Sequence, residues 1–146
     1  MNSLVIACSS CGTKNRIPAD KQHLRPKCGN CKTAISLAES VVPVELDDSD
    51  FQGFINQVSK PVMVDFFSPT CGPCRMLAPT IDSMAKKFFG RVIIAKLDTS
   101  RNQKAATQYK IRGVPTLFFF KNGELVDQKT GALPEQELAQ LLERLV

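Results

Sequence analysis

The 146-residue sequence has no tryptophan, a single histidine, and no apolar run near the roughly 18–20 residues that a membrane-spanning helix needs. The missing apolar run excludes a helical membrane protein. The N-terminus has a short apolar patch at residues 4–7, but it lacks the basic start and full-length apolar core of a secretion signal. We therefore expect a cytoplasmic protein with reduced thiols. In that compartment, cysteines serve metal binding or catalysis more often than structural disulfides.

All six cysteines occur as Cys-x-x-Cys pairs, at Cys8/Cys11, Cys28/Cys31 and Cys71/Cys74. Sixteen residues separate the first two pairs, a spacing typical of four-cysteine zinc sites. Because four ligands of one kind leave no open coordination position, we predict a structural Zn²⁺ rather than a catalytic one. Gly12 and Gly29 can adopt positive φ, which would turn backbone amides toward the sulfurs. Two disulfides or four free thiols are the alternative, and a reducing compartment argues against it.

The segment between these two pairs is polar, with Ile17 and Leu24 as its two large apolar residues. It cannot bury enough surface to fold alone, so a metal would supply the missing free energy. His23 could replace one cysteine ligand, but four cysteines suffice and we expect it on the surface. Six Lys/Arg against two acidic residues give residues 1–40 a net charge of +4, which a zinc–tetrathiolate site would reduce to about +2. We place a zinc-binding module at residues 1–40 and expect no nucleic-acid partner.

Residues 41–146 alternate between strand and helix patterns. The predicted strands span residues 42–46, 61–67 and 91–99, and a hairpin with an Asn122-Gly123 turn spans 115–131; the predicted helices span 47–58, 71–90, 100–110 and 134–146. We assign Met76 to the buried face of helix 71–90, expect a kink at Pro79, and take Ser100 as the cap of helix 100–110. This order predicts an α/β domain, with a central mixed sheet covered by helices on both faces.

The third cysteine pair lies between a buried strand and a long helix. Cys71 should sit at the helix N-terminus, where backbone N–H groups and the helix dipole stabilise a thiolate, and Cys74 should be more shielded. Asp65 interrupts the apolar run of residues 62–67, and burial would raise its pKa enough for it to carry a proton. Lys96 is a plausible neighbour on the adjacent strand. The plainer alternatives are a solvent-facing Asp65 on an edge strand and a surface Lys96.

These residues lie within motifs that resemble a known family. Residues 41–146 resemble thioredoxin in the sequences VDFF before CGPC, AKLDT, GVPTLFFFKNGE and TGAL. With the four-cysteine module in front, the whole chain resembles the zinc-bearing, second type of bacterial thioredoxin. The resemblance implies a thioredoxin fold and a thiol–disulfide oxidoreductase that reduces protein disulfides.

The resemblance also implies a role for individual residues. Cys71 would attack a target disulfide and Cys74 would resolve the mixed disulfide. Asp65, with Lys96 nearby, would help deprotonate Cys74, and Pro115 would be a cis-proline packed against the disulfide. A flat docking surface would comprise Gly72, Pro73, Gly113, Val114, Gly131 and Ala132. An NADPH-dependent flavoprotein, thioredoxin reductase, would recharge the pair, and no bound organic cofactor is expected.

The sequence departs from the family pattern before CGPC. Thr70 and Phe67 stand where the family commonly has tryptophans, and Pro69 precedes Thr70. The change removes aromatic contact area beside the nucleophile, which bears on the partner range and the reduction potential but not on the reaction type. Two other functions stay open: an oxidase or isomerase of the same fold, and a redox-sensing, zinc-dependent binding adaptor. The missing signal peptide and the Gly-Pro dipeptide argue against the first, and the intact Cys71/Cys74 pair against the second.

Overall fold

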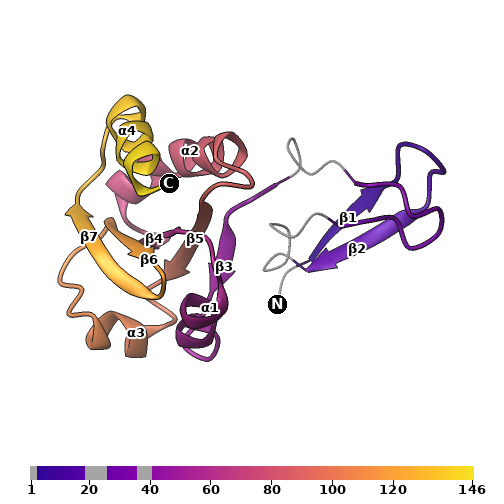
Figure 1. Cartoon of the computed structure of the whole chain (residues 1–146). Helices are drawn as coiled ribbons and strands as arrows, with labels where there is room; N and C mark the ends of the chain where they lie inside the picture. Colours follow the sequence, from indigo (N-terminus) through magenta and orange to yellow (C-terminus); the bar gives the residue numbers. More distant parts are fainter. Residues whose placement is uncertain (1–2, 19–25, 36–40) are drawn as a thin grey trace.

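The structure, a computed structural model, describes residues 3–18, 26–35 and 41–146. In chain order its elements are β1 (Ser3–Ala7), β2 (Lys14–Pro18), β3 (Val44–Leu46), α1 (Phe51–Gln57), β4 (Val62–Phe67), α2 (Gly72–Lys87), β5 (Ile93–Asp98), α3 (Gln103–Gln108), β6 (Thr116–Lys121), β7 (Glu124–Thr130) and α4 (Glu135–Leu145). Strands β1 and β2 pair antiparallel, and the other five strands form a second sheet (Figure 1). The described helices include none long and apolar enough to cross a membrane.

The second sheet has the strand order β3-β5-β4-β6-β7. Strands β3, β5 and β4 run parallel, and β6 and β7 join antiparallel. β4 lies near the centre and is apolar over almost its whole length, as expected for a strand covered on both faces. At the hairpin between β6 and β7, Asn122 and Gly123 both have positive φ, as a two-residue turn of this kind requires. The predicted α/β fold with a mixed sheet is confirmed.

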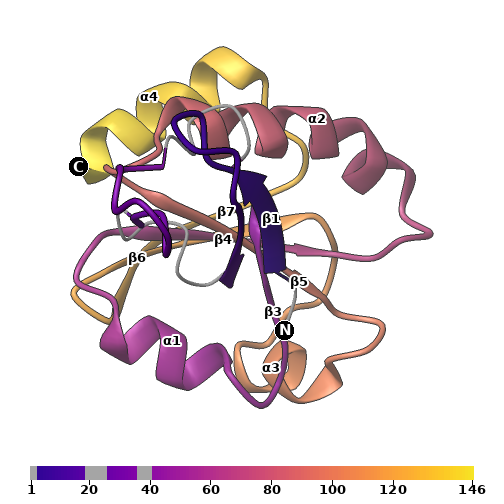
Figure 2. The same ribbon diagram turned by 90° about the vertical axis from the view of Figure 1, so that its right-hand side faces the viewer.

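Helices cover both faces of this sheet (Figure 2). α2 and α4 pack on one face, in a core that includes Met63, Leu77 and Leu138. α1 and α3 pack on the other face, where Val64 and Phe66 contribute to a second core. Because side chains alternate along a strand, the residue between Val64 and Phe66 points to the α2 face. That residue is Asp65.

Two local predictions were wrong. Met76 is 79% exposed, because the buried face of α2 runs through Leu77, Ile81 and Met84, and Met76 lies one residue out of phase. Ser100 does not cap a helix, since its hydroxyl donates instead to Asp98 Oδ1 at 2.6 Å. α3 begins three residues later, at Gln103. Pro79 lies inside α2, and a kink there stays a prediction.

Candidate functional site

The Cys71/Cys74 pair occupies the start of α2. Cys71 is the N-cap residue, with extended backbone angles, and Cys74 lies in the first turn of the helix. The two residues form a disulfide, with their Cα atoms 5.2 Å apart. The backbone N–H of Cys74 donates to Cys71 Sγ at 3.2 Å. One of the unpaired amides of the helix N-terminus is thus directed at the sulfur that would carry negative charge in the reduced pair.

The two cysteines differ in their exposure to solvent. Cys71 is half-buried, whereas Cys74 is only 4% exposed. The residues between them, Gly72 and Pro73, are exposed and leave the approach to Cys71 open. Cys71 is therefore the more accessible residue of the pair.

A second loop lies against Cys71. The peptide bond between Val114 and Pro115 is cis, and the Val114 carbonyl oxygen lies 3.6 Å from Cys71 Sγ. The hydroxyl of Thr116 donates to the Gly113 carbonyl at 2.6 Å. The backbone N–H of Gly131 donates to the Pro115 carbonyl at 2.8 Å. These bonds bring residues 113–116 and 131 together beside the disulfide, and the exposed Ala132 follows directly.

Asp65 is buried on the sheet face that α2 covers. It is only 4% exposed, and among the described residues its Oδ1 is a buried oxygen with no hydrogen-bond partner. Burial raises the pKa of Asp65 to about 7, and the positive charge of Lys96 acts against that rise. The edge-strand alternative is wrong, because β4 pairs with β5 on one side and β6 on the other.

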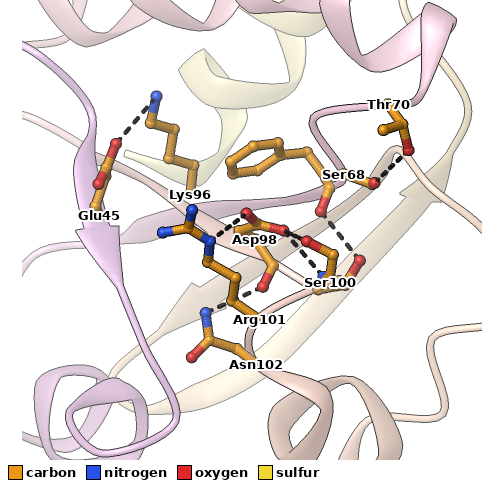
Figure 3. Close-up of polar contacts among 10 residues, drawn as sticks. Glu45, Ser68, Thr70, Lys96, Asp98, Ser100, Arg101 and Asn102 are labelled. Atoms are coloured by element: carbon orange, nitrogen blue, oxygen red, sulfur yellow. Dashed lines mark hydrogen bonds and ion pairs between the residues drawn. The ribbon is translucent and has the colours of Figure 1, made fainter.

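Lys96 lies opposite Asp65 in the parallel register of β4 and β5. Its side chain is 30% exposed, and its Nζ lies 3.5 Å from Glu45 Oε1, on β3. The same ammonium lies 5.6 Å from the centre of the Phe67 ring. Figure 3 shows Glu45 and Lys96 directed toward each other. Sequence reasoning missed Glu45, because a glutamate in a three-residue strand gives no signal until the strand pairing is known.

Polar bonds hold the loop before Cys71. The Arg75 side chain donates from Nε to the Pro69 carbonyl at 2.8 Å. The hydroxyls of Ser68 and Thr70 lie 3.2 Å apart (Figure 3). Thr70 is exposed, so the position that the family commonly fills with tryptophan presents a small polar side chain here. Arg75 was not predicted from the sequence, since its partner is a backbone carbonyl.

The four N-terminal cysteines form a compact cluster. Their sulfurs all lie within 4.8 Å of one another, with Cys8–Cys31 and Cys11–Cys28 each 3.6 Å apart. A tetrahedral ion with Zn–S bonds of about 2.3 Å would hold its sulfurs about 3.8 Å apart. The cluster therefore fits zinc, and it is separate from the Cys71/Cys74 pair.

The two halves of the cluster repeat the same bonds. The N–H of Ser10 donates to Cys8 Sγ, and the N–H of Asn30 donates to Cys28 Sγ, both at 3.4 Å. A threonine follows two residues after the second cysteine of each half, with its hydroxyl oxygen 3.1–3.2 Å from that sulfur. In the sequence, this repeat is the C-x-T pattern CGT and CKT. It could have identified both threonines as sulfur partners.

These donors favour thiolates. The Thr13 hydroxyl and backbone amide lower the pKa of the Cys11 thiol to about 5. The backbone N–H of Cys31 and the side-chain amide of Asn15 lower the pKa of Cys28. Since a metal binds the thiolate form, these donors prepare the Cys11 and Cys28 sulfurs for a cation. The pKa of Cys8 is instead raised: the hydrogen bonds from the backbone N–H groups of Cys11 and Ser10 lower it, but burial and the neighbouring Cys31 and Cys11 thiols outweigh them.

The backbone prediction for these turns was half wrong. Gly12 has φ +78°, as expected, but Gly29 does not have positive φ. The equivalent of Gly12 in the second half is Lys32, with φ +67°, because the left-handed residue is the one after the second cysteine. The segment between the pairs contributes β2, with Ile17 buried. His23, Leu24 and the expected boundary near residue 40 lie outside the described residues.

Comparisons with known proteins match this geometry. The family model described as thioredoxin matches residues 41–144, and the model described as the thioredoxin 2 N-terminal zinc ribbon matches residues 7–33. Thioredoxin C-3 of Corynebacterium nephridii is 37% identical over 141 residues, which cover 97% of this chain and 94% of that protein. Thioredoxin 1 of Nostoc sp. is 43% identical over 100 residues, 68% of this chain and 94% of that protein. Thioredoxin of Haemophilus influenzae is 38% identical over 99 residues, 68% of this chain and 92% of that protein. Since the thioredoxin model covers more than half of the chain and these relatives are 37–43% identical over two thirds of it or more, the chain belongs to the thioredoxin family of protein-disulfide oxidoreductases.

Proposed function

We propose that Cys71 and Cys74 reduce disulfide bonds in target proteins, with Cys71 as the attacking thiol and Cys74 as the resolving thiol. The observation that carries this assignment is their unequal exposure. The half-buried Cys71 accepts a hydrogen bond from the helix N-terminus, and Cys74 is almost fully buried behind it. A nucleophile has to be reachable and stabilised as a thiolate, and a resolving thiol has to be within reach of the first sulfur alone.

The reaction has two exchange steps. The Cys71 thiolate attacks one sulfur of the target disulfide, a bond forms between them, and the other target sulfur leaves as a thiolate that takes a proton from water. Cys74 then loses its proton through water to the Asp65 carboxylate and attacks Cys71 Sγ. The Cys71–Cys74 bond forms and the mixed disulfide breaks, so the target gains two electrons and the pair loses them. A carboxyl whose pKa is about 7 is suited to accept and release this proton near neutral pH.

The target would lie across the loops that surround Cys71. The proposed docking residues are Gly72, Pro73, Gly113, Val114, Gly131 and Ala132, with Pro115 beside the disulfide. The Val114 carbonyl, 3.6 Å from Cys71 Sγ, supports this role because an extended target segment that reaches Cys71 would lie beside this backbone group and could pair with it. Thr70 in place of an aromatic residue reduces the apolar contact that this surface offers.

The spent disulfide needs an electron donor. We infer that an NADPH-dependent thioredoxin reductase restores the dithiol, as the family membership suggests. We also infer that residues 1–40 form a module that binds one structural Zn²⁺ through Cys8, Cys11, Cys28 and Cys31, that residues 41–146 form the catalytic domain, and that the protein works in the cytoplasm. A reducing compartment keeps four metal-binding thiolates available.

The experiment is disulfide reduction by the zinc-loaded full chain, with insulin as the test disulfide and thioredoxin reductase with NADPH as the donor. We expect turnover with wild type, and none with Cys71→Ser. Cys74→Ser should form a mixed disulfide with the target that cannot resolve, visible by mass spectrometry. Turnover by Cys71→Ser, or trapping through Cys74 instead, would contradict the assignment of the two thiols.

The reduction potential decides between a reductant and an oxidase or isomerase. Equilibration in defined glutathione buffers, followed by mass spectrometry because the chain lacks tryptophan, should give a value near the roughly −270 mV typical of thioredoxins. A value above about −200 mV would make the protein an oxidant under cytosolic conditions. A complete lack of turnover with an intact pair would favour a binding adaptor.

A further inference from the structure

Three charged side chains form a row across the parallel strands. Glu45 on β3 is paired in register with Lys96 on β5, and Lys96 is paired in register with Asp65 on β4. Residues in one register row of a sheet point to the same face, with neighbouring strands about 4.8 Å apart. Lys96 therefore lies between two carboxyl groups, one buried and one at the open edge of the sheet.

The ammonium of Lys96 is directed to only one of these carboxyl groups. Its Nζ lies 3.5 Å from Glu45 Oε1. Among the described residues, Asp65 has no ion pair, and its Oδ1 has no hydrogen-bond partner. A flexible lysine beside a buried carboxyl would otherwise be drawn toward it. The Glu45 carboxylate competes for the same cation.

Other charged or titratable groups on the surrounding elements are engaged elsewhere or lie further away. They are Cys74 in its disulfide, Arg75 on the Pro69 carbonyl, Asp98 with Ser100 and Arg101, Glu135 with Ser83, and Lys129 in the same row beyond Leu117. Lys96 is the neighbouring charge that acts on Asp65. The orientation of Lys96 therefore controls the electrostatic environment of the proton acceptor.

We infer that Glu45 is a positioning residue, whose carboxylate holds the Lys96 ammonium toward β3 and so preserves the strength of Asp65 as the proton acceptor for Cys74. This inference rests on the role proposed for Asp65. Without Glu45, Lys96 can turn to Asp65 and stabilise its carboxylate. A stabilised carboxylate is a weaker base, so the Cys74 proton would be removed less readily.

The test is Glu45→Gln in the oxidised, zinc-loaded full chain, with the Asp65 carboxyl titrated by carbon NMR. We expect the pKa of Asp65 to fall by about 0.3–1 pH unit, the range for an ammonium that moves from about 7 Å to about 4 Å from the carboxyl at effective dielectric constants of about 80 to 25. The matched control is Glu143→Gln, which removes the α4 carboxylate of the exposed Arg91–Glu143 ion pair. It should leave the titration of Asp65 unchanged.

Repeating the titration in Lys96→Gln protein separates an effect through Lys96 from a direct effect of the Glu45 charge on Asp65. In Lys96→Gln protein, adding Glu45→Gln should move the Asp65 pKa by less than half as much as it does when Lys96 is present. An equal shift in both backgrounds would mean that Glu45 acts through its own charge, and would overturn the positioning role. No shift with Lys96 present would also overturn it.

The kinetic readout is the pH dependence of insulin reduction. Glu45→Gln should move the acid limb of kcat/KM to lower pH by the same 0.3–1 pH unit. If Asp65→Asn leaves the wild-type profile intact, the proposed role of Asp65 fails. The NMR titration of Asp65 would still decide whether Glu45 positions Lys96, so the two failures are distinguishable.

Discussion

At the scale of single residues, the buried carboxyl of Asp65 has a pKa suited to proton transfer, and its burial lowers the stability of the fold. Its carboxyl is buried on the sheet face that α2 covers, and burial raises its pKa from the ordinary 3.8 to about 7. Between these two values the folded chain holds a proton that the unfolded chain releases. Raising the pH through this window therefore removes stability, by an amount on the order of 4 kcal/mol in all.

Asp65→Asn should remove this pH dependence. Between pH 5 and pH 8 we expect the wild-type free energy of unfolding to fall by about 2.5 kcal/mol more than that of the variant, because only the wild type has to ionise a buried carboxyl. Urea unfolding followed by circular dichroism at both pH values measures the difference. Asp82→Asn, at an exposed position on α2, is the control and should follow the wild type. Parallel profiles for wild type and Asp65→Asn would show that Asp65 is ionised in the folded state across the whole range.

The sequence predicted some of these residues for clear physical reasons. The apolar residues on both sides of Asp65 indicate a buried strand, so the burial of its carboxyl could be predicted. Cys71 and Cys74 stood out because a strand pattern precedes them and a helix pattern follows. Lys32 was missed because the left-handed position of its turn is a glycine, Gly12, in the other half of the cluster. Glu45 was missed because its importance depends on strand register.

At the scale of elements, α3 is held by a residue from far away in the chain. Its N-cap residue, Asn102, makes no side-chain capping bond. Asp48 caps it instead: its Oδ1 accepts from the N–H of Ala105 at 2.8 Å and its Oδ2 from the N–H of Lys104 at 3.2 Å. The sequence around residue 100 does not contain this distant cap, so the local pattern favours Ser100 although Asp48 makes the bonds.

Asp48→Ala should therefore destabilise the protein by about 1–2 kcal/mol, the usual range for loss of a helix cap. Two amides at the start of α3 would lose a charged acceptor. Asp48→Asn, which keeps one oxygen, should lose less. Chemical denaturation of the wild type and the two variants at pH 7 measures the order of their free energies of unfolding. An Asp48→Ala variant as stable as the wild type would mean that water replaces the carboxylate at no cost.

At the scale of the whole molecule, the sequence predicts the domain of residues 41–146 more completely than the module. Its strands and helices follow strong periodic patterns, and the order βαβαβαββα admits few topologies. In the module, the hairpin of β1 and β2 was not predicted, because β1 (SLVIA) is a short apolar run without alternation and β2 (KNRIP) is mostly polar, so neither gives a clear strand pattern. The cysteine spacing predicted the metal cluster of the module. The backbone conformation of the module depends on hydrogen bonds to sulfur, which the spacing does not show.

The structure predicts that metal removal affects the two regions differently. The buried residues of the described module are Cys8, Ile17 and Cys28, too few to stabilise a fold, so the roughly 10–16 kcal/mol of structural zinc binding would supply most of its stability. In the described parts of the chain, the hairpin and the five-stranded sheet share no strand.

After chelation of the full chain, amide hydrogen exchange should rise sharply in residues 3–18 and 26–35. Exchange in the cores of β4 and β5 should stay slow, and insulin reduction should continue. Cys11→Ser/Cys31→Ser should reproduce this result without a chelator. If chelation accelerated exchange in β4 and β5 as well, the two regions would unfold as one cooperative unit, and the proposed division near residue 40 would be wrong.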